Sequence, residues 1–348
     1  MEDSVMYRYA VLANPGHNRV YFEAAVQMAR AELALALPRL CAPCGDISRE
    51  IFGGVPYICF SSEAPLTPAD ARLLSALSFT YALFSVADAQ DVLLSPVPLP
   101  PWQYIGEEVS SILKYTGKTN PLFTRLLLNI GLLSMDSPAE TVRVLDPVAG
   151  KGTTLFVAAA LGLDAYGIEI GERAASEAYH YMKKYLETER HKHAAKTERV
   201  GLPCGTAIRY SIDITRTKED ARQGNGRHWE MAACDTAHAD KLYKKNFFHL
   251  LIGDLPYGVQ HAAVTNEKQS ARTRSPEPLL RTCLGAWKQV LKPGGVMVLS
   301  WNTLVCPREQ LASLLADAGF TVLSGDAYTG FSHRVDQSIR RDVIAAKK

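Results

Sequence analysis

One stretch, VLDPVAGKGTTLFVAAALGLDAYGIEI over residues 144–170, constrains the fold more than any other part of the chain. Two short apolar runs, residues 142–145 and 165–168, predict buried strands. A turn with two glycines follows the first run, and residues 153–161 then predict a helix. The second strand ends on Glu169. A strand, a glycine turn, a helix and a strand ending in an acid are typical of one βαβ half of a nucleotide-binding α/β fold.

The turn itself favours S-adenosylmethionine (SAM) over a dinucleotide. Its pattern is D-P-x-A-G-x-G-T rather than G-x-G-x-x-G, so Asp146 ends the first strand. A carboxylate there would repel a pyrophosphate, whereas it accepts hydrogen bonds from the ammonium group of SAM. Glu169, about 20 residues further on, suits a ribose diol. The alternative is a glycine turn in another α/β fold. The residues expected to bind the cofactor here are Asp146, Pro147, Ala149, Gly150, Gly152, Thr153 and Glu169.

The composition is that of an ordinary globular protein. With 348 residues, 47% of them hydrophobic, the chain is long enough for a large core and two modules. It has no apolar run of about 18 residues, so no membrane contact is expected. Its N-terminus, MEDSVMYRYA, lacks the basic region of a secretory signal. Seven scattered cysteines suit a reducing cytoplasm, and the single C-x-x-C of Cys41 and Cys44 has no matching pair, so no metal site is expected.

The charge is unevenly distributed. Residues 1–100 hold six Arg, no Lys and ten acids, a net charge of −4, although the whole chain carries +2. Residues 183–249 hold fourteen Lys and Arg against nine acids. A polyanion is therefore expected to approach the C-terminal part, although a solvated face explains the modest surplus nearly as well.

Three regions follow from the pattern of the chain. Residues 1–94 predict a small α+β module with the ferredoxin-like order β-α-β-β-α-β. Three alternatives for its role are docking to a partner subunit, homodimerisation and shaping of the substrate cleft. Residues 95–140 start with SPVPLPPWQ and predict a proline-rich linker and a helical connector. Residues 141–348 predict a seven-stranded Rossmann-like sheet. A polar insertion at about 187–227 is expected to be a flap, a mobile loop or a solvated segment.

Two further residues are placed beside the cofactor by their position in the pattern. Pro121 predicts the start of a helix that Thr119 or Asn120 caps. Thr119 then precedes the first strand and is expected to border the methionine end of SAM. Asp235 ends a strand over residues 229–234 and is expected to accept from the adenine amine, with an ordinary surface aspartate as the alternative.

The residues expected to carry the chemistry are Asp254, Leu255, Pro256 and Tyr257, which follow a strand over 247–252. This tetrad resembles the [DN]-P-P-[YF] motif of methyltransferases that modify planar nitrogens, with Leu255 in place of the first proline. The lone pair of a base amine is delocalised into the ring, so two fixed acceptors are needed to orient it. The Asp254 carboxylate, which also borders the cofactor, and the Leu255 carbonyl would be these acceptors. Pro256 would stiffen the turn and Tyr257 would stack on the base. The alternative is a purely structural turn.

Residues 115–348 resemble the RNA guanine-N2 methyltransferases that pair a THUMP module with a Rossmann-like domain, above all the tRNA guanosine-10 enzymes of archaea and eukaryotes. The matching stretches are GKTNPLFTRLLLN, DPVAGKGTT, GIEI, CD, DLPYG and LKPGG. In those enzymes the first five line the cofactor and amine sites. The resemblance implies a class I SAM-dependent methyltransferase. The first 100 residues are too few for both a ferredoxin-like piece and a full THUMP domain, so the chain departs from these relatives there.

The function expected from these patterns is a cytoplasmic, SAM-dependent N-methyltransferase of RNA. Guanine N2 of tRNA is the favoured target, which makes tRNA processing the expected process, and rRNA is the alternative RNA. The same chemistry on DNA adenine or protein glutamine would use the same tetrad, but glutamine enzymes more often begin it with Asn. A non-catalytic, methyltransferase-like scaffold subunit is the alternative outside enzymes.

Overall fold

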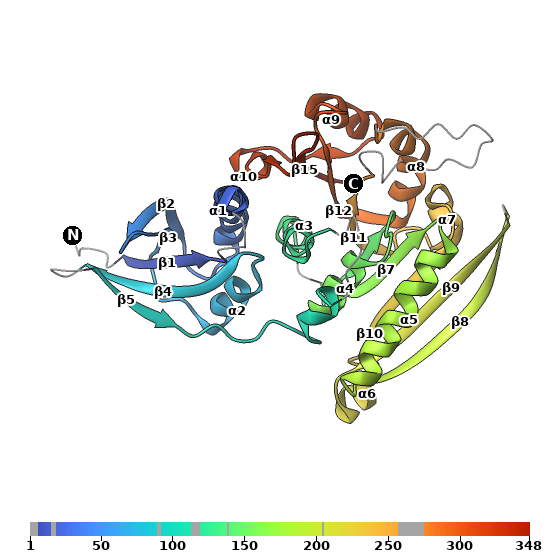
Figure 1. Ribbon diagram of the computed structural model, residues 1–348, viewed down its shortest axis with the longest axis horizontal. Coiled ribbons are helices and arrows are strands. Elements are labelled where there is room, and N and C mark those ends of the chain that lie inside the picture. Colours follow the sequence, from blue (N-terminus) through green and yellow to red (C-terminus); the bar gives the residue numbers. More distant parts are fainter. Residues whose placement is uncertain are drawn as a thin grey trace. The chain divides into compact units, whose positions relative to one another are not determined.

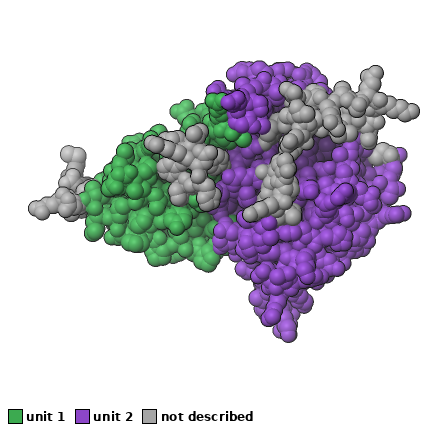
Figure 2. Space-filling view, viewed as in Figure 1, with its two compact units in different colours: residues 1–102, 324–335 green, residues 103–323, 336–348 purple. Residues whose placement is uncertain are grey.

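The structure is a computed structural model that describes residues 6–14, 19–88, 92–112, 119–137, 139–203, 205–256 and 275–348. The chain forms two compact units (Figure 2). The first consists of residues 1–102 and 324–335, and the second consists of residues 103–323 and 336–348. None of the described helices is both long and apolar enough to cross a membrane.

The first unit contains an antiparallel sheet in the order β2-β3-β1-β4-β5. Its first six main elements follow the order β-α-β-β-α-β, and β5 is an additional strand that includes Ser95–Val97, the first residues of the predicted linker. The elements are β1 (Tyr7–Ala13), α1 (Arg19–Ala36), η1 (Leu37–Arg39), β2 (Cys44–Phe52), β3 (Val55–Ser62), α2 (Pro68–Ala76), β4 (Thr80–Asp88) and β5 (Val92–Val97).

Local sequence signals explain where these elements begin and turn. Gly53 and Gly54 have φ angles of +57° and +80°, the left-handed conformations that a tight hairpin between β2 and β3 requires. Helix α2 begins with a capping box, in which the Thr67 side chain accepts from the Asp70 amide and the Asp70 side chain accepts from the Thr67 amide at 2.8 Å. Both boundaries are therefore set by a few local residues.

A late segment of the chain belongs to this first unit. Residues 324–335 carry α10 (Asp326–Thr329) and β14 (His333–Arg334) and follow the strand β13 (Thr321–Val322) of the second unit. A Cβ at Gly330 would lie 2.7 Å from the Cβ of Ala31 in α1, so the two backbones approach closely there. The order of the sequence alone does not show this return.

The second unit is an α/β domain whose elements lie on both faces of one mixed sheet (Figure 1). The elements are η2 (Glu107–Ser110), α3 (Pro121–Ser134), β6 (Arg143–Asp146), α4 (Thr153–Ala160), β7 (Asp164–Glu169), α5 (Glu172–Thr188), β8 (Lys192–Leu202), β9 (Gly205–Thr215), α6 (Lys218–Gln223), β10 (Arg227–Ala233), η3 (Thr236–His238), α7 (Ala239–Leu242), β11 (Phe248–Asp254), α8 (Glu277–Val290), β12 (Leu291–Asn302), α9 (Arg308–Asp317), β13 (Thr321–Val322) and β15 (Arg340–Lys347).

The sheet of this unit is larger than the seven strands predicted. Among the residues that the structure describes, nine of its strands follow the order β13-β15-β12-β11-β6-β7-β10-β9-β8. The five central strands β10, β7, β6, β11 and β12 run parallel to one another. On the two sides of this group, β9 is antiparallel to β10, and β15 is antiparallel to β12 and to β13. The predicted βαβ half is confirmed as β6, α4 and β7.

The two extra strands come from the segment that was predicted to be a polar insertion. The interpretation of residues 187–227 as a flap or loop was wrong, because β8 and β9 form a long antiparallel hairpin whose inner strand pairs with β10. Figure 1 shows this hairpin beside α5, which packs on β9 and β10. The side chains of Tyr210, Ile212 and Ile214 in β9 are buried, and this burial holds the hairpin on the domain.

Candidate functional site

The parallel strands β6 and β11 lie side by side, and the chain leaves them in opposite directions along the sheet. From β6 it passes through α4 to β7 on one side, and from β11 it passes through α8 to β12 on the other. The carboxyl ends of two such strands form the crevice where open α/β sheets bind ligands. Asp146 ends β6 and Asp254 ends β11, so two predicted site residues meet at this point.

Asp146 is the most enclosed carboxyl group of the site. It is 3% exposed, and its Oδ1 accepts from the Val148 amide at 3.0 Å. Burial raises the pKa of Asp146 to about 7; the hydrogen bonds from Thr154 and Val148 oppose this shift, and the charges of Asp254 and Glu169 add to it. A nearby cation would favour the ionised form, which is consistent with the expected position next to a positively charged ligand.

The glycine turn leaves open space for a ligand. Gly150 has a φ of +53°, and nothing lies within 4 Å of the position that a Cβ would take there. The Gly150 amide donates to Oε2 of Glu169 at 2.9 Å, and the Gly171 amide donates to Oε1 at 2.8 Å. The carboxylate of Glu169 is therefore held at the mouth of the turn, where it has lone pairs left for a further donor.

The remaining predicted residues of the turn support its shape. Gly152 has a φ of +85° and precedes α4, whose first residue is Thr153. A Cβ at Gly167 of β7 would lie 2.9 Å from Ala149 and Leu155, so the helix packs tightly on the strand. Pro147, Ala149 and Thr153 are buried in the structure. The predicted cofactor residues of this stretch therefore lie together at one end of the sheet.

Asp254 is contacted by three side chains that are far apart in the sequence. Thr119, just ahead of α3, donates its hydroxyl to Oδ2 at 2.7 Å. Ser300 in β12 donates its hydroxyl to Oδ1. Arg341 in β15 places Nη2 at 3.8 Å from Oδ2, and its guanidinium carbon lies 4.7 Å from the centroid of the Phe123 ring. The orientation of the carboxylate is therefore defined by its neighbours.

The other residues of the tetrad are only partly within the described chain. Leu255 is fully buried, and its amide donates to the Ser300 carbonyl at 2.9 Å, which anchors the turn after β11. Pro256 is the last described residue there, and Tyr257 lies outside the described residues. Asn120 caps α3 by accepting from the Leu122 amide at 2.9 Å, and Pro121 opens the helix, as predicted.

Asp235 lies at the carboxyl end of β10, where its Oδ1 accepts from the Ala237 amide at 2.9 Å. It lines an open pocket of 670 Å³, a size within the usual range for small-molecule sites. Ile170, which follows Glu169, lines the same pocket, and the opposite wall comes from β8 and β9. The predicted adenine residue thus faces a cavity, and the hairpin contributes to it.

Sequence reasoning did not find Ser300 and Arg341. Ser300 is the one polar residue within the apolar run VMVLSW, and a polar side chain at the end of a buried strand is a usable signal. Arg341 carries no comparable signal, because only the antiparallel pairing of β15 with β12 brings it near Asp254. In the described part of the chain, no three or more His, Cys, Asp or Glu residues are grouped to hold a metal ion.

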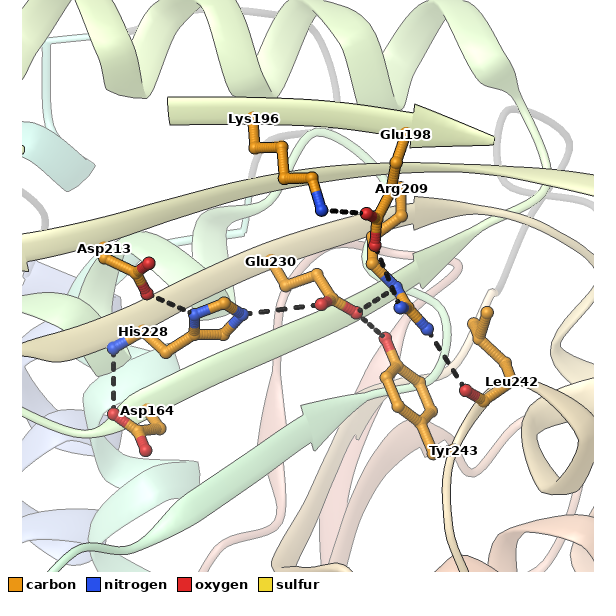
Figure 3. Close-up of polar contacts among 9 residues, drawn as sticks. All are labelled: Asp164, Lys196, Glu198, Arg209, Asp213, His228, Glu230, Leu242 and Tyr243. Atoms are coloured by element: carbon orange, nitrogen blue, oxygen red, sulfur yellow. Dashed lines mark hydrogen bonds and ion pairs between the residues drawn. The ribbon is translucent and has the colours of Figure 1, made fainter. Parts of the chain in front are cut away.

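A second cluster of charged residues lies at the β8–β9 hairpin, and we call it the Glu230 network (Figure 3). Glu230 is 5% exposed and accepts from the Tyr243 hydroxyl at 2.8 Å. Arg209 lies 3.2 Å from the same carboxylate, and His228 lies 3.4 Å from it and 2.7 Å from Asp213. Burial lowers the pKa of His228, but the hydrogen bonds to Glu230 and Asp213 outweigh it and raise the pKa above its usual value. Two further residues belong to the network. Arg209 also pairs with Glu198, and Glu198 pairs with Lys196.

Comparison with protein families matches residues 123–316 to the family described as "RMKL-like, methyltransferase domain", more than half of the 348 residues. Matching solved structures include the rRNA methyltransferase aviRa from Streptomyces viridochromogenes, at 13% identity over 70% of this chain and 94% of that chain, with a TM-score of 0.40. An rRNA methylase from Streptococcus thermophilus matches at 13% identity over 66% and 97%, with a TM-score of 0.32. A TehB-like SAM-dependent methyltransferase from Corynebacterium glutamicum matches at 10% identity over 61% and 82%, with a TM-score of 0.35. No curated protein matches the chain.

Proposed function

The chain belongs to the family of RMKL-like methyltransferase domains, and on that premise we propose that it methylates an exocyclic base amine in RNA, most specifically guanine N2 of tRNA. It is a SAM-dependent methyltransferase, and its cofactor supplies an electrophilic methyl group on a sulfonium centre. The residues fit this cofactor. The open space over Gly150, the carboxylate of Glu169 and the pocket at Asp235 would hold it, with Asp146 enclosed behind the turn.

The observation that carries the proposal is the position of Asp254. Its carboxylate ends β11 next to β6, on the ligand side of the sheet. A base amine is a poor nucleophile because its lone pair is delocalised into the ring. An acceptor in a fixed orientation can take one of its N–H bonds and so direct the lone pair. Thr119 and Ser300 supply that fixed orientation by their hydrogen bonds to Asp254.

Asp254 retains the capacity to accept this further hydrogen bond. An ionised carboxylate has about four lone-pair sites. Thr119 uses one on Oδ2 and Ser300 uses one on Oδ1, while Arg341 lies at 3.8 Å and acts mainly through its charge. Two sites are therefore left for a substrate. The proton of the amine leaves after methyl transfer, when the nitrogen is acidic, either to Asp254 or to water.

The substrate and the remaining expectations are part of the proposal. RNA is supported by the surplus of Lys and Arg over residues 183–249, which lies in the second unit. The element order and the sheet order β2-β3-β1-β4-β5 support a ferredoxin-like first unit, with docking or dimerisation as its role. The described cysteines are free, which supports action in the cytoplasm. A base that is single-stranded or flipped out of its stack is the expected form of the substrate.

The experiment that tests the proposal measures methyl transfer from tritiated SAM to RNA of a strain that lacks this protein. Small RNA and ribosomal RNA are assayed separately, and the labelled nucleosides are identified. Label in N2-methylguanosine from the small RNA fraction is the expected result. Label in ribosomal RNA alone would replace tRNA by rRNA as the substrate. No label in either fraction, with SAM binding intact, would contradict an RNA substrate.

A substitution of Asp254 tests its proposed role as the acceptor for the amine. Asp254→Ala is expected to lower the transfer rate by a factor of about 100 or more, and to leave much of the SAM binding because the turn and Glu169 are unchanged. Asp317→Ala, at the exposed end of α9, is the control for loss of an aspartate and should transfer at the normal rate. Full turnover by the Asp254 variant would contradict its assigned role.

A further inference from the structure

The pocket at Asp235 has a wall that the Rossmann-like strands do not supply. Ile170 and Asp235 follow the ends of β7 and β10, as expected for a cofactor site. The facing wall is formed by Arg199 of β8 together with Thr206 and Ile208 of β9. These three residues come from the hairpin within the segment that was predicted to be a polar insertion.

The strand register shows that this wall continues the ligand edge of the sheet. Glu169 of β7 is paired with Ala233 of β10, Ala233 is paired with Ile208, and Ile208 is paired with Arg199. Directly paired residues of neighbouring strands point to the same face. Glu169, Ile208 and Arg199 therefore lie on one face of the sheet, in one row across four strands. Thr206 lies two residues beyond Ile208 on the same face.

We propose that the β8–β9 hairpin forms the outer wall of the adenine end of the SAM site, with Ile208, Thr206 and Arg199 as residues that determine cofactor affinity. Ile208 offers apolar surface to a planar base, and Thr206 offers a hydroxyl that donates to or accepts from a ring nitrogen. Arg199 offers a planar guanidinium, which stacks well on aromatic rings. The inference rests on SAM as the cofactor and on the assignment of Asp235 to the adenine, and not on the identity of the RNA.

The opposite face of the hairpin explains how such a wall keeps its position. Arg209 points to that face and reaches Glu198 of β8 and Glu230 of β10, at 3.2 Å in each case (Figure 3). It also donates to the Leu242 carbonyl at 3.2 Å. These contacts tie both strands of the hairpin to the domain, so the residues of the pocket face are carried by a supported element rather than a loose loop.

The test measures binding of S-adenosylhomocysteine and of adenosine to the full chain by isothermal titration calorimetry. The variants are Ile208→Ala, Thr206→Val and Arg199→Ala. The control is Lys196→Ala, which removes a cation from the same strand but on the face of the Glu230 network. Each pocket variant is expected to weaken the binding of both ligands by about 5-fold to 10-fold, as for the loss of one good contact. The control is expected to stay within about 2-fold of the unmodified protein.

The outcomes separate this inference from the proposed function. Unchanged affinity in all three pocket variants would overturn the inference, and so would an equal loss in Lys196→Ala, because the effect would then come from the hairpin as a whole. Thermal unfolding of each variant checks that the fold is kept, and Thr206→Val preserves shape if Ile208→Ala unfolds. If the variants change the binding of S-adenosylhomocysteine as expected but the protein methylates no RNA, the role of the hairpin in the cofactor site is supported and the proposed RNA substrate is contradicted.

Discussion

At the scale of single residues, Asp146 and Asp254 end neighbouring strands but differ in their surroundings. Asp146 is 3% exposed and lies behind the glycine turn, whereas the side chain of Asp254 is 17% exposed and is reached by Thr119, Ser300 and Arg341. One carboxyl group is thus enclosed and the other is oriented for contact. This difference in environment fits the roles given to the two residues in the proposed function, Asp146 behind the cofactor and Asp254 toward the substrate.

The raised pKa of Asp146 predicts a pH-dependent stability. The value of about 7 in the folded protein lies above the model-peptide value of 3.8, so the folded state binds more protons between these values. The contribution of this group to the free energy of unfolding is therefore fully present below about pH 4 and is lost as the pH rises through about 7. Asp146→Asn removes the titrating group. The variant is expected to be as stable as or more stable than the unmodified protein at pH 8, with this advantage disappearing at pH 5.

Urea denaturation at pH 5 and pH 8 measures this effect, and each unit of pKa difference corresponds to about 1.4 kcal/mol. Asp317→Asn, at the exposed end of α9, is the control. The difference between its free energies of unfolding at pH 5 and pH 8 should equal that of the unmodified protein. A loss of stability in Asp146→Asn that is larger at pH 8 than at pH 5 would show that the buried carboxyl is ionised and paired in the fold.

Thr119 has two possible roles at its position, contact with the cofactor and orientation of Asp254, and a substitution distinguishes them. Its place in the sequence predicts contact with the cofactor, but in the structure its hydroxyl donates to Asp254 at 2.7 Å. Thr119→Val keeps the shape and removes the donor. We expect kcat for methyl transfer to fall by about 10-fold, equivalent to about 1.4 kcal/mol of barrier, while the Kd for S-adenosylhomocysteine stays within about 2-fold. Thr119→Ser keeps the hydroxyl and should retain activity. Weaker binding of S-adenosylhomocysteine with unchanged kcat would instead support the cofactor role.

At the scale of elements, the β8–β9 hairpin has a strand signal in its sequence that the average polarity of the segment conceals. Ile208, Tyr210, Ile212 and Ile214 alternate with polar residues, which is the period of a half-buried strand. The flanking Gly, Lys, Arg and Thr residues make the whole segment polar on average, and this average led to the interpretation as a loop. The apolar strands β6, β7 and β11 were predicted because burial on both faces leaves nearly uninterrupted apolar runs.

The candidate site was predictable where one short stretch supplies several residues. Asp146, Gly150 and Glu169 come from a single βαβ half, so their spacing carries the information. Ser300 and Arg341 reach the same site from β12 and β15, and Thr206 and Ile208 reach the pocket from β9. Their positions depend on strand register, which a single sequence leaves open because long-range pairing is set by the whole sheet.

The Glu230 network predicts that the hairpin region is more stable in acid than in base. The pKa of His228 is raised in the fold, so the stability that its charged form contributes is fully present below the unfolded pKa. That stability is lost as the pH rises through the folded pKa. His228→Gln is expected to lower Tm more at pH 5.5 than at pH 8.5. His180→Gln, at an exposed position of α5, is the control and should show the same small change at both values.

Differential scanning calorimetry in buffers of low ionisation enthalpy gives Tm at the two pH values. A larger loss at pH 8.5 would mean that His228 is neutral between Asp213 and Glu230, and that the network is held by hydrogen bonds alone.

At the scale of the whole molecule, the chain passes three times between its units. It leaves the first unit after residue 102, builds most of the second, returns for residues 324–335 and ends in the second unit with β15. β15 then pairs with β12 and carries Arg341 to Asp254. The proline-rich stretch after residue 95 marks only the first of these passages, since prolines and glycines signal a linker locally and do not report a later return of the chain.

Gly330 tests whether the returning segment is a packed part of the first unit. Its φ is −80°, so alanine is compatible with the backbone there, but a Cβ would lie 2.7 Å from the Cβ of Ala31. Gly330→Ala is therefore expected to destabilise the protein by about 1–3 kcal/mol through steric overlap. Ala31→Gly removes the opposing methyl group, and the double variant Ala31→Gly with Gly330→Ala should recover part of the loss. Denaturation of the four proteins gives the coupling free energy, which is expected to be about 0.5 kcal/mol or more in favour of the double variant. Additive effects of the two substitutions would mean that α10 moves away from α1 at little cost, and the segment would then be only loosely attached to the first unit.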